Sequence, residues 1–178
     1  MERELRRFLV WFADPPSSLD GLLRAGLTHL WFVTLHPFED GNGRIARALT
    51  DMALAQDERQ PQRFFSLSVR IEQERNAYYE VLERTQRGEL DVTPWLSWFL
   101  EQTAAACGLA ETTVSRVLAK ARFWLRHQGA SLNDRQRKVL NRMLDAGPEG
   151  FEGGITTRKY SNLARVSPSS ILMSIAIP

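Results

Sequence analysis

Twelve residues, from His36 to Arg47, combine the residue types that phosphate chemistry needs. They read His-Pro-Phe-Glu-Asp-Gly-Asn-Gly-Arg-Ile-Ala-Arg. A histidine can remove a proton from an incoming hydroxyl near neutrality, because an imidazole ordinarily titrates near pH 6.5. The sequence therefore predicts a general base at His36.

The turn that follows this histidine predicts a site for an anion. Gly41, Asn42 and Gly43 tolerate unusual backbone angles, and their N–H groups would face a ligand together with the positive end of the next helix. Arg44 and Arg47 are three residues apart, so both guanidinium groups can reach one di- or triphosphate.

Asp40 lies directly before this turn and would repel a phosphate unless a divalent cation lay between them. Mg²⁺ is the natural candidate, because it prefers carboxylate and phosphate oxygens. Each feature alone has a plainer interpretation, since a histidine near a helix end is usually a surface residue and Gly-x-Gly is usually a turn. Their coincidence within twelve residues favours a phosphate site.

Helices are predicted on both sides of the turn. Apolar residues recur at helical spacing from Leu5 to Phe12, and they occupy all faces over 19–35, as in a helix buried within a bundle. Ser18 is the expected cap of that helix, and Pro37 should end it at His36. Further helices are expected over 44–56, 69–87, 91–108, 111–128, 132–144 and 157–164, with Asn133 or Ser131 as a cap and one strand-like stretch at 63–67. The predicted fold class is all-α.

Composition narrows the class of protein. The 178 residues fit one medium domain, or one domain with a small appendage, and no apolar run approaches the roughly 20 residues that span a bilayer. The N-terminus has no apolar segment typical of a secretory signal. Cys107 is the single cysteine, and its alanine neighbours suggest a buried thiol in a reducing compartment, so we expect a cytoplasmic protein that contacts no membrane.

The twelve residues resemble the motif of the Fic family, His-x-Phe-x-[Asp/Glu]-Gly-Asn-Gly-Arg-x-x-Arg, at every specified position. Members mostly transfer AMP from MgATP to a Ser, Thr or Tyr hydroxyl of a target protein. The resemblance implies a nucleotidyltransferase with His36 as general base, Asp40 as Mg²⁺ ligand and a buried Phe38 that anchors the loop. It also implies that Gly41, Asn42, Gly43, Arg44 and Arg47 bind the ATP phosphates. Position 43 retains the second glycine of the family motif, and by this resemblance it favours AMP transfer over phosphorylation.

The resemblance extends over roughly residues 5–128. The segment 75–86 is similar to the family's nucleoside-binding helix, which implies nucleotide contacts from Tyr78, Tyr79 and Gln86. Aromatic residues further on, at Trp95, Trp98 and Phe99, are interpreted as core. The two other histidines, His29 and His127, are interpreted as structural, because neither has further metal ligands nearby.

Two departures from the family pattern stand out. Only 35 residues precede His36, which leaves little room for the flap that holds a target peptide or for an inhibitory helix. No full inhibitory motif is found, so Arg47 has no predicted glutamate partner. We therefore expect residues 1–128 to form a Fic domain lacking these two regions.

Residues 131–178 resemble an incomplete winged-helix (helix-turn-helix) segment of the kind that follows Fic domains in bacterial proteins. They carry seven Lys or Arg against four Asp or Glu, so the basic excess of the chain lies here and DNA is a candidate partner. The expected recognition helix is replaced by an apolar, uncharged end, which suggests a truncation or a frameshift. Ile171, Leu172, Ile175 and Ile177 are expected to cover exposed core or to be disordered.

Three hypotheses for function follow from these features. The first is a Fic-like helical bundle that transfers AMP from ATP to a protein hydroxyl. The second is a non-catalytic fragment that binds nucleotide, or a remnant DNA-binding regulator. The third is removal of AMP from a modified target. Homodimer formation stays open.

Overall fold

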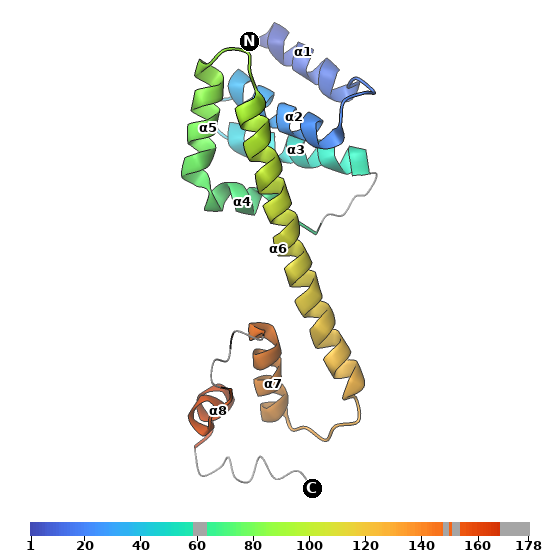
Figure 1. Cartoon of the computed structure of the whole chain (residues 1–178), viewed down its shortest axis with the longest axis vertical. Coiled ribbons are helices and arrows are strands. Elements are labelled where there is room, and N and C mark those ends of the chain that lie inside the picture. The colour runs from blue at the N-terminus through green and yellow to red at the C-terminus, as the bar shows by residue number, and fades with distance from the viewer. Residues whose placement is uncertain (59–63, 148–149, 151–153, 168–178) are drawn as a thin grey trace. The chain divides into compact units, whose positions relative to one another are not determined.

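The computed structural model describes residues 1–58, 64–147, 150 and 154–167, and within them the chain forms eight helices and no strand (Figure 1). The all-α prediction is confirmed for these residues; the strand-like stretch forms no strand over 64–67. The helices are α1 Glu2–Ala13, α2 Gly21–Leu35, α3 Asn42–Glu58, α4 Leu67–Gln73, α5 Arg75–Arg87, α6 Thr93–Arg126, α7 Asp134–Ala146 and α8 Thr157–Ala164.

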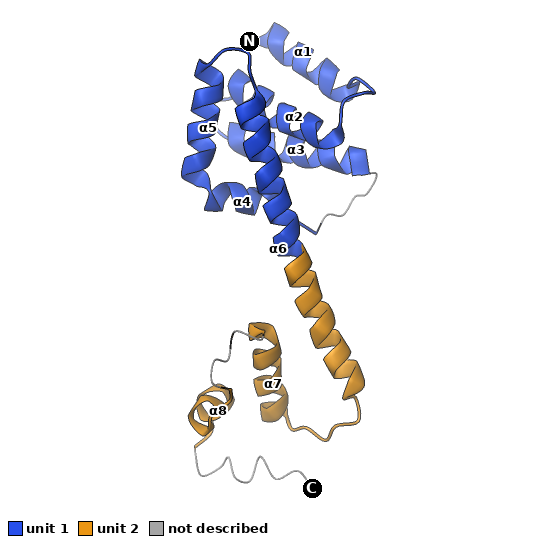
Figure 2. Cartoon of the chain, in the orientation of Figure 1, with its two compact units in different colours: residues 1–110 blue, residues 111–178 orange. Residues whose placement is uncertain are grey.

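The chain divides into two compact units, Met1–Ala110 and Glu111–Pro178, which Figure 2 colours separately. We call them unit 1 and unit 2. The division falls inside α6, whereas the sequence placed it at the Gly129–Ala130 break. The reason is that the second half of α6 pairs with α7, through the Lys120 and Asp145 side chains at 2.6 Å.

Helix α2 begins and ends at polar residues that satisfy its free backbone groups. Asp20 is the N-cap, because its carboxylate accepts hydrogen bonds from the N–H groups of Leu22 and Leu23 at 2.9 and 3.2 Å. The prediction of Ser18 as the cap is therefore wrong. At the other end His36 adopts left-handed backbone angles, φ 47° and ψ 54°, and its N–H donates to the carbonyl of Phe32.

Two predicted helix patterns differ from the structure. The helix expected over 69–87 is two helices, because Glu74 leaves helical geometry at ψ 32° between α4 and α5. The two helices expected over 91–108 and 111–128 are one helix, α6. Residues 108–110 are Gly-Leu-Ala, and an isolated glycine weakens a helix without ending it.

The core of unit 1 is aromatic and centres on α2, which lies beside α3 (Figure 1). Phe8, Trp95 and Phe99 are fully buried, as predicted for the two α6 residues, and Trp98 is partly buried beside them. The indole N–H of Trp95 donates to the carbonyl of Gly26 at 2.8 Å. A Cβ at Gly26 would lie only 3.0 Å from Leu96 and 3.1 Å from Phe99, so the glycine favours the close approach of α6 to α2.

Unit 2 is held together by the packing of α7 against α8 and by side-chain contacts of α6 with α7. Asn133 and Gln136 form a capping box at the start of α7, which confirms Asn133 as the cap. The indole N–H of Trp124 donates to Asn141 at 3.0 Å. The prediction for the apolar C-terminal residues lies outside the described residues.

Two further predictions concern single features. Cys107 is exposed, so the prediction of a buried thiol is wrong; its neighbour Ala106 faces the core instead. Among the described residues, no helix is both long and apolar enough to cross a membrane.

Candidate active site

The predicted base, His36, lies at the exposed end of a buried helix. Helix α2 is the most buried helix of unit 1, and its last turn brings the chain to the surface at His36. The left-handed conformation of His36 turns the backbone sharply into the loop 37–41. The imidazole is thus carried by a rigid helix and is accessible from solvent.

The loop between α2 and α3 is fixed by Asn42. This side chain is 3% exposed, and its amide oxygen accepts from the N–H of Phe38 at 3.1 Å while its amide nitrogen donates to the Phe38 carbonyl at 2.6 Å. Both hydrogen bonds connect the start of α3 to the residue two positions after the histidine. The Asn42 side chain therefore shapes the loop and leaves only its backbone N–H to face a ligand.

The expectation that Phe38 is buried is wrong. Its side chain is 48% exposed, and its ring centroid lies 6.4 Å from that of Phe32 in the core. The physical reason is the pair of backbone hydrogen bonds to Asn42, which hold the loop without a buried aromatic anchor.

The start of α3 has the geometry of an anion site. Gly41 has φ +85°, a conformation that strains any residue with a side chain, and its carbonyl accepts the first hydrogen bond of α3, from Ile45. The N–H groups of Asn42, Gly43 and Arg44 are the first of the helix and have no partner within it. These N–H groups and the positive end of the helix dipole favour negative charge.

The two motif arginines differ in their surroundings. Arg44 is exposed and pairs with Asp40 at 2.9 Å, a contact that an exposed surface makes weak and easily replaced. Arg47 is partly buried, and no salt bridge to it forms among the described residues. A side chain at Gly43 would lie against its guanidinium, 3.5 Å away. The guanidinium of Arg47 is therefore available to bind an anionic ligand.

Magnesium fits the donor set that the loop provides. Asp40 offers one carboxylate, 90% exposed, beside the free N–H groups of α3. No group of three or more metal-binding side chains occurs among the described residues. Mg²⁺ is held in this way by proteins that supply one or two carboxylates and leave the other positions to phosphate oxygens and water.

A buried hydrogen-bond chain, which the sequence did not predict, connects three helices beneath the site. The His29 ring lies between Thr50 of α3 and Tyr78 of α5, with Nδ1 and Nε2 each 3.0 Å from a hydroxyl oxygen. The hydroxyl of Thr50 donates its hydrogen bond to the carbonyl of Ala46. Its oxygen must therefore accept the hydrogen bond from His29 Nδ1–H. We assign the Nδ1-protonated, neutral ring, whose Nε2 accepts from the Tyr78 hydroxyl. The chain ends at the carbonyl next to Arg47.

Burial keeps both titratable groups of this chain, His29 and Tyr78, neutral near neutral pH. Burial first, and then the positive charge of Arg47, lower the pKa of His29 from 6.5 to about 3. Burial raises the pKa of Tyr78 to about 12, with a smaller contribution from Tyr79 in the same direction and an opposing one from Arg47. The structural interpretation of His29 agrees with its complete burial.

The three predicted nucleoside contacts all lie on α5 but differ in burial, because Tyr79 and Gln86 are exposed and Tyr78 is not. Tyr78 is 4% exposed, and its hydroxyl is used by His29, so it is a core residue and the predicted contact does not fit it. Tyr79 is 55% exposed, with the guanidinium of Arg75 over its ring. The contact predicted for Tyr79 remains a prediction.

Gln86 lies at a pocket of about 520 Å³ in unit 1. Its amide donates to the hydroxyl of Thr34, two residues before the predicted base, at 3.1 Å. The pocket is lined mainly by apolar side chains, among them Trp11 and Trp31. A flat, apolar group with polar edges would fit this lining. The contact predicted for Gln86 therefore remains a prediction with a pocket beside it.

Comparison with known proteins agrees with the resemblance of the motif. Residues 2–54, which include the whole of 36–47, match the model of the Fic/DOC family. The chain is 32% identical over 117 residues to the protein adenylyltransferase Fic of Nematostella vectensis, which covers 64% of the chain and 26% of that protein. It is 31% identical over 100 residues to the protein adenylyltransferase Fic of Drosophila yakuba, covering 56% of the chain and 19% of that protein. The match thus spans about a quarter or less of these relatives.

Proposed function

This chain belongs to the Fic/DOC family, and on that premise we propose that it transfers AMP from MgATP to a Ser, Thr or Tyr hydroxyl of a target protein. The observation that carries the proposal is the arrangement of His36, the free N–H groups of α3 and Arg47 around one short loop fixed by Asn42. A base lies at one side of this loop and an anion site at the other.

In the proposed reaction, Nε2 or Nδ1 of His36 takes the proton of the target hydroxyl. The hydroxyl oxygen forms a bond to the α-phosphorus, the bond from that phosphorus to the bridging oxygen breaks, and pyrophosphate leaves. The N–H groups of α3, with Arg44 and Arg47, stabilise the charge on the phosphates. When bound, Mg²⁺ at Asp40 would neutralise part of the phosphate charge.

The two arginines have different surroundings, and we assign them different roles. Arg44 exchanges Asp40 for phosphate, whereas Arg47, which forms no salt bridge with any described residue, binds phosphate from its partly buried position. The adenine would lie toward Gln86 and Tyr79. Tyr78 supports the site from the core, through His29 and Thr50.

The test is transfer of label from ATP labelled at the α-phosphate to protein. We expect His36→Ala to retain MgATP binding, measured by calorimetry, and to lose at least about 100-fold in labelling rate, because it removes the base. His127→Ala is the matched control, since that ring is exposed and lies in unit 2. Equal labelling by His36→Ala would contradict the mechanism. MgATP binding without labelling by the unmodified chain would favour the non-catalytic alternative.

A further inference from the structure

A basic groove lies between α7 and α8 in unit 2. Two hollows of about 530 and 540 Å³ adjoin there and share Arg142, Asp145 and Leu163 in their linings. We call their union the α7–α8 groove. It is separate from the loop 36–47, which belongs to unit 1.

The cations of the groove outnumber its effective anions. Four Lys or Arg side chains line it, namely Arg137, Lys138 and Arg142 from α7 and Lys159 from α8. Two acids also line it, but Asp145 is paired with Lys120 at 2.6 Å, so its charge is already compensated. The other acid is Asp134, at the start of α7. The groove therefore presents a net positive charge.

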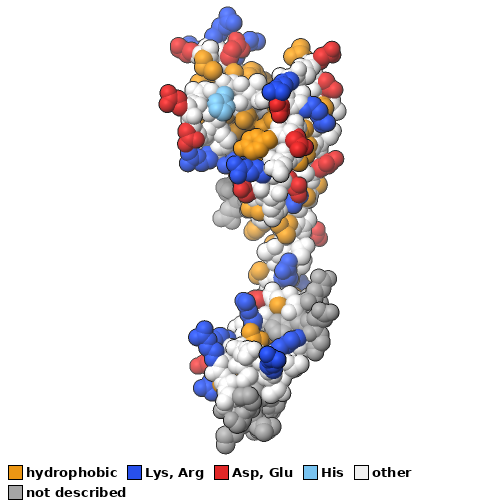
Figure 3. Space-filling model, turned by 90° about the vertical axis from the view of Figure 1, so that its left-hand side faces the viewer, with side chains coloured by type: hydrophobic (Ala, Val, Ile, Leu, Met, Phe, Trp, Pro, Cys, Tyr) orange, Lys and Arg blue, Asp and Glu red, His pale blue; other side chains and the backbone are white. Residues whose placement is uncertain are grey.

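This groove is the concave part of a wider division of charge. Residues 111–178 carry eleven Lys or Arg against five Asp or Glu, a net of +6; because the whole chain is +2, residues 1–110 carry −4. On the face of unit 2 seen in Figure 3, blue Lys and Arg side chains are more prominent than red acidic ones. An acidic unit and a basic unit thus share one chain.

We propose that the α7–α8 groove binds the sugar–phosphate backbone of a nucleic-acid duplex. The Lys and Arg side chains that line the groove fit phosphate oxygens, and Asn162 adds an uncharged amide to the lining. A single strand is bound differently, by aromatic rings on which bases stack. Among the described residues no aromatic side chain lines the groove.

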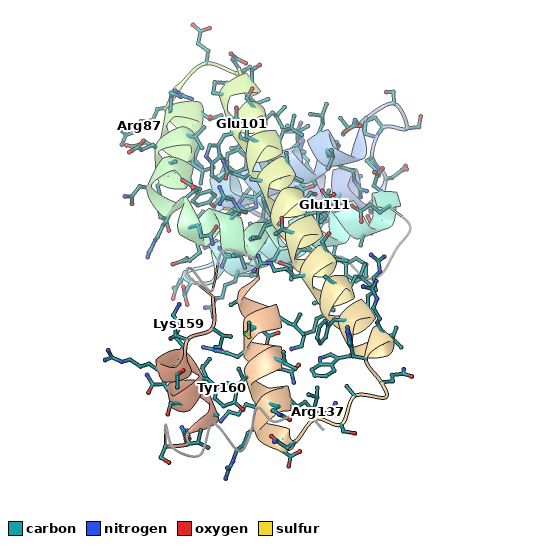
Figure 4. The ribbon with its side chains drawn as sticks, turned by 60° about the horizontal axis from the view of Figure 1, so that its bottom comes forward. Arg87, Glu101, Glu111, Arg137, Lys159 and Tyr160 are labelled. Carbon is teal, nitrogen blue, oxygen red and sulfur yellow. The ribbon has the colours of Figure 1, made fainter. Side chains whose placement is uncertain are left out.

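Two aromatic residues of unit 2, Trp124 and Tyr160, do not line the groove. The ring of Trp124 is covered by the guanidinium of Arg137, 5.0 Å from the ring centroid, and its N–H is bound to Asn141. The Tyr160 hydroxyl is buried. Figure 4 labels Arg137 on α7, and Lys159 and Tyr160 on α8. The groove therefore offers charge without stacking, which predicts binding that depends on salt and little on base sequence.

The experiment measures binding of the full chain to fluorescent DNA and RNA duplexes of one sequence, by anisotropy, from 50 to about 200 mM salt. We expect a Kd of about 10⁻⁶ to 10⁻⁴ M near physiological salt. The double variant Lys138→Gln, Arg142→Gln should weaken binding about 10- to 100-fold and reduce the slope of log K against log salt by about 2. Preference for one duplex would identify the sugar recognised, and equal binding the phosphate alone; both support the groove.

The matched control is Arg3→Gln, Arg6→Gln, which removes the same charge from exposed positions of α1 in unit 1. It should leave the affinity and the slope unchanged. The proposal is overturned by absence of salt-dependent binding to both duplexes, or by equal weakening in the two double variants. Equally tight binding to phosphatidylserine vesicles, lost in the same groove variant, would also overturn it. Circular dichroism of each variant checks that the fold is retained.

Discussion

At the scale of single residues, His36 and Asn42 have different roles in the loop. His36 provides an accessible imidazole at the end of a buried helix, and the Asn42 side chain holds the backbone that follows it. The family motif specifies both residues, but for Asn42 the sequence predicts only a phosphate contact and not the hydrogen bonds of its side chain to Phe38. The role of the Asn42 side chain depends on the distance of its amide from the N–H and C=O groups of Phe38.

We predict that Asn42→Ala lowers the free energy of unfolding by about 1–3 kcal/mol, because it leaves the N–H and C=O groups of Phe38 without their partner. Labelling from ATP should fall more than this loss of stability explains, since the loop that orients His36 is released. Urea unfolding and labelling rates measure the two effects. Asn76→Ala, at an exposed position of α5, is the control and should change neither. Normal stability and labelling in Asn42→Ala would show that the loop is held otherwise.

At the scale of helices, the chain from Tyr78 through His29 and Thr50 to Ala46 joins α5, α2 and α3. His29 was interpreted as structural from the sequence, and its complete burial agrees. Its partners could not be predicted, because they lie 21 and 49 residues away in the chain and meet it only through helix packing. The same packing explains why Tyr78, though next to exposed Tyr79, is a core residue.

The neutral His29 makes stability depend on pH. The unfolded chain binds a proton at this ring near pH 6.5, whereas the folded chain resists protonation down to about pH 3. The contribution of the neutral His29 ring to the free energy of unfolding is therefore fully present above pH 6.5. It is lost progressively as the pH falls from 6.5 toward 3. The slope should reach about 1.4 kcal/mol per pH unit, measured by urea unfolding between pH 7.5 and about 4.5.

His29→Gln isolates this effect, because glutamine does not titrate. The variant should be less stable at pH 7.5, since it disrupts a buried chain, but it should lose less stability on acidification than the unmodified protein. His127→Ala, which alters an exposed histidine, should keep the original slope. Parallel pH profiles for the unmodified protein and His29→Gln would contradict a neutral buried ring.

Helix ends that depend on local residues can be predicted from the sequence, whereas ends that depend on packing cannot. Asn133 and Pro37 have local effects, a cap and a restricted neighbour, and the corresponding ends of α7 and α2 were predicted. The break at Glu74 and the continuity of α6 through Gly108 depend on the packing of the helices, and both were missed. The exposure of Cys107 was missed for the same reason, because one step along a helix exchanges a buried face for an exposed one.

At the scale of the whole chain, charge and chemistry are assigned to different units. The motif lies in unit 1, at −4, and the α7–α8 groove lies in unit 2, at +6. The sequence placed the basic excess after residue 130, and the second half of α6 adds to it through Lys120 and three arginines. The winged-helix resemblance of residues 131–178 remains a prediction, because its third helix would lie outside the described residues.

The most direct test of the central claim compares two samples of ATP, one labelled at the α-phosphate and one at the γ-phosphate, each incubated with the full chain, Mg²⁺ and a protein extract. Transfer of AMP predicts label on protein from the α-labelled sample alone, and its loss in His36→Ala but not in His127→Ala. Label from the γ-phosphate, or α-label that persists in His36→Ala, would contradict the account.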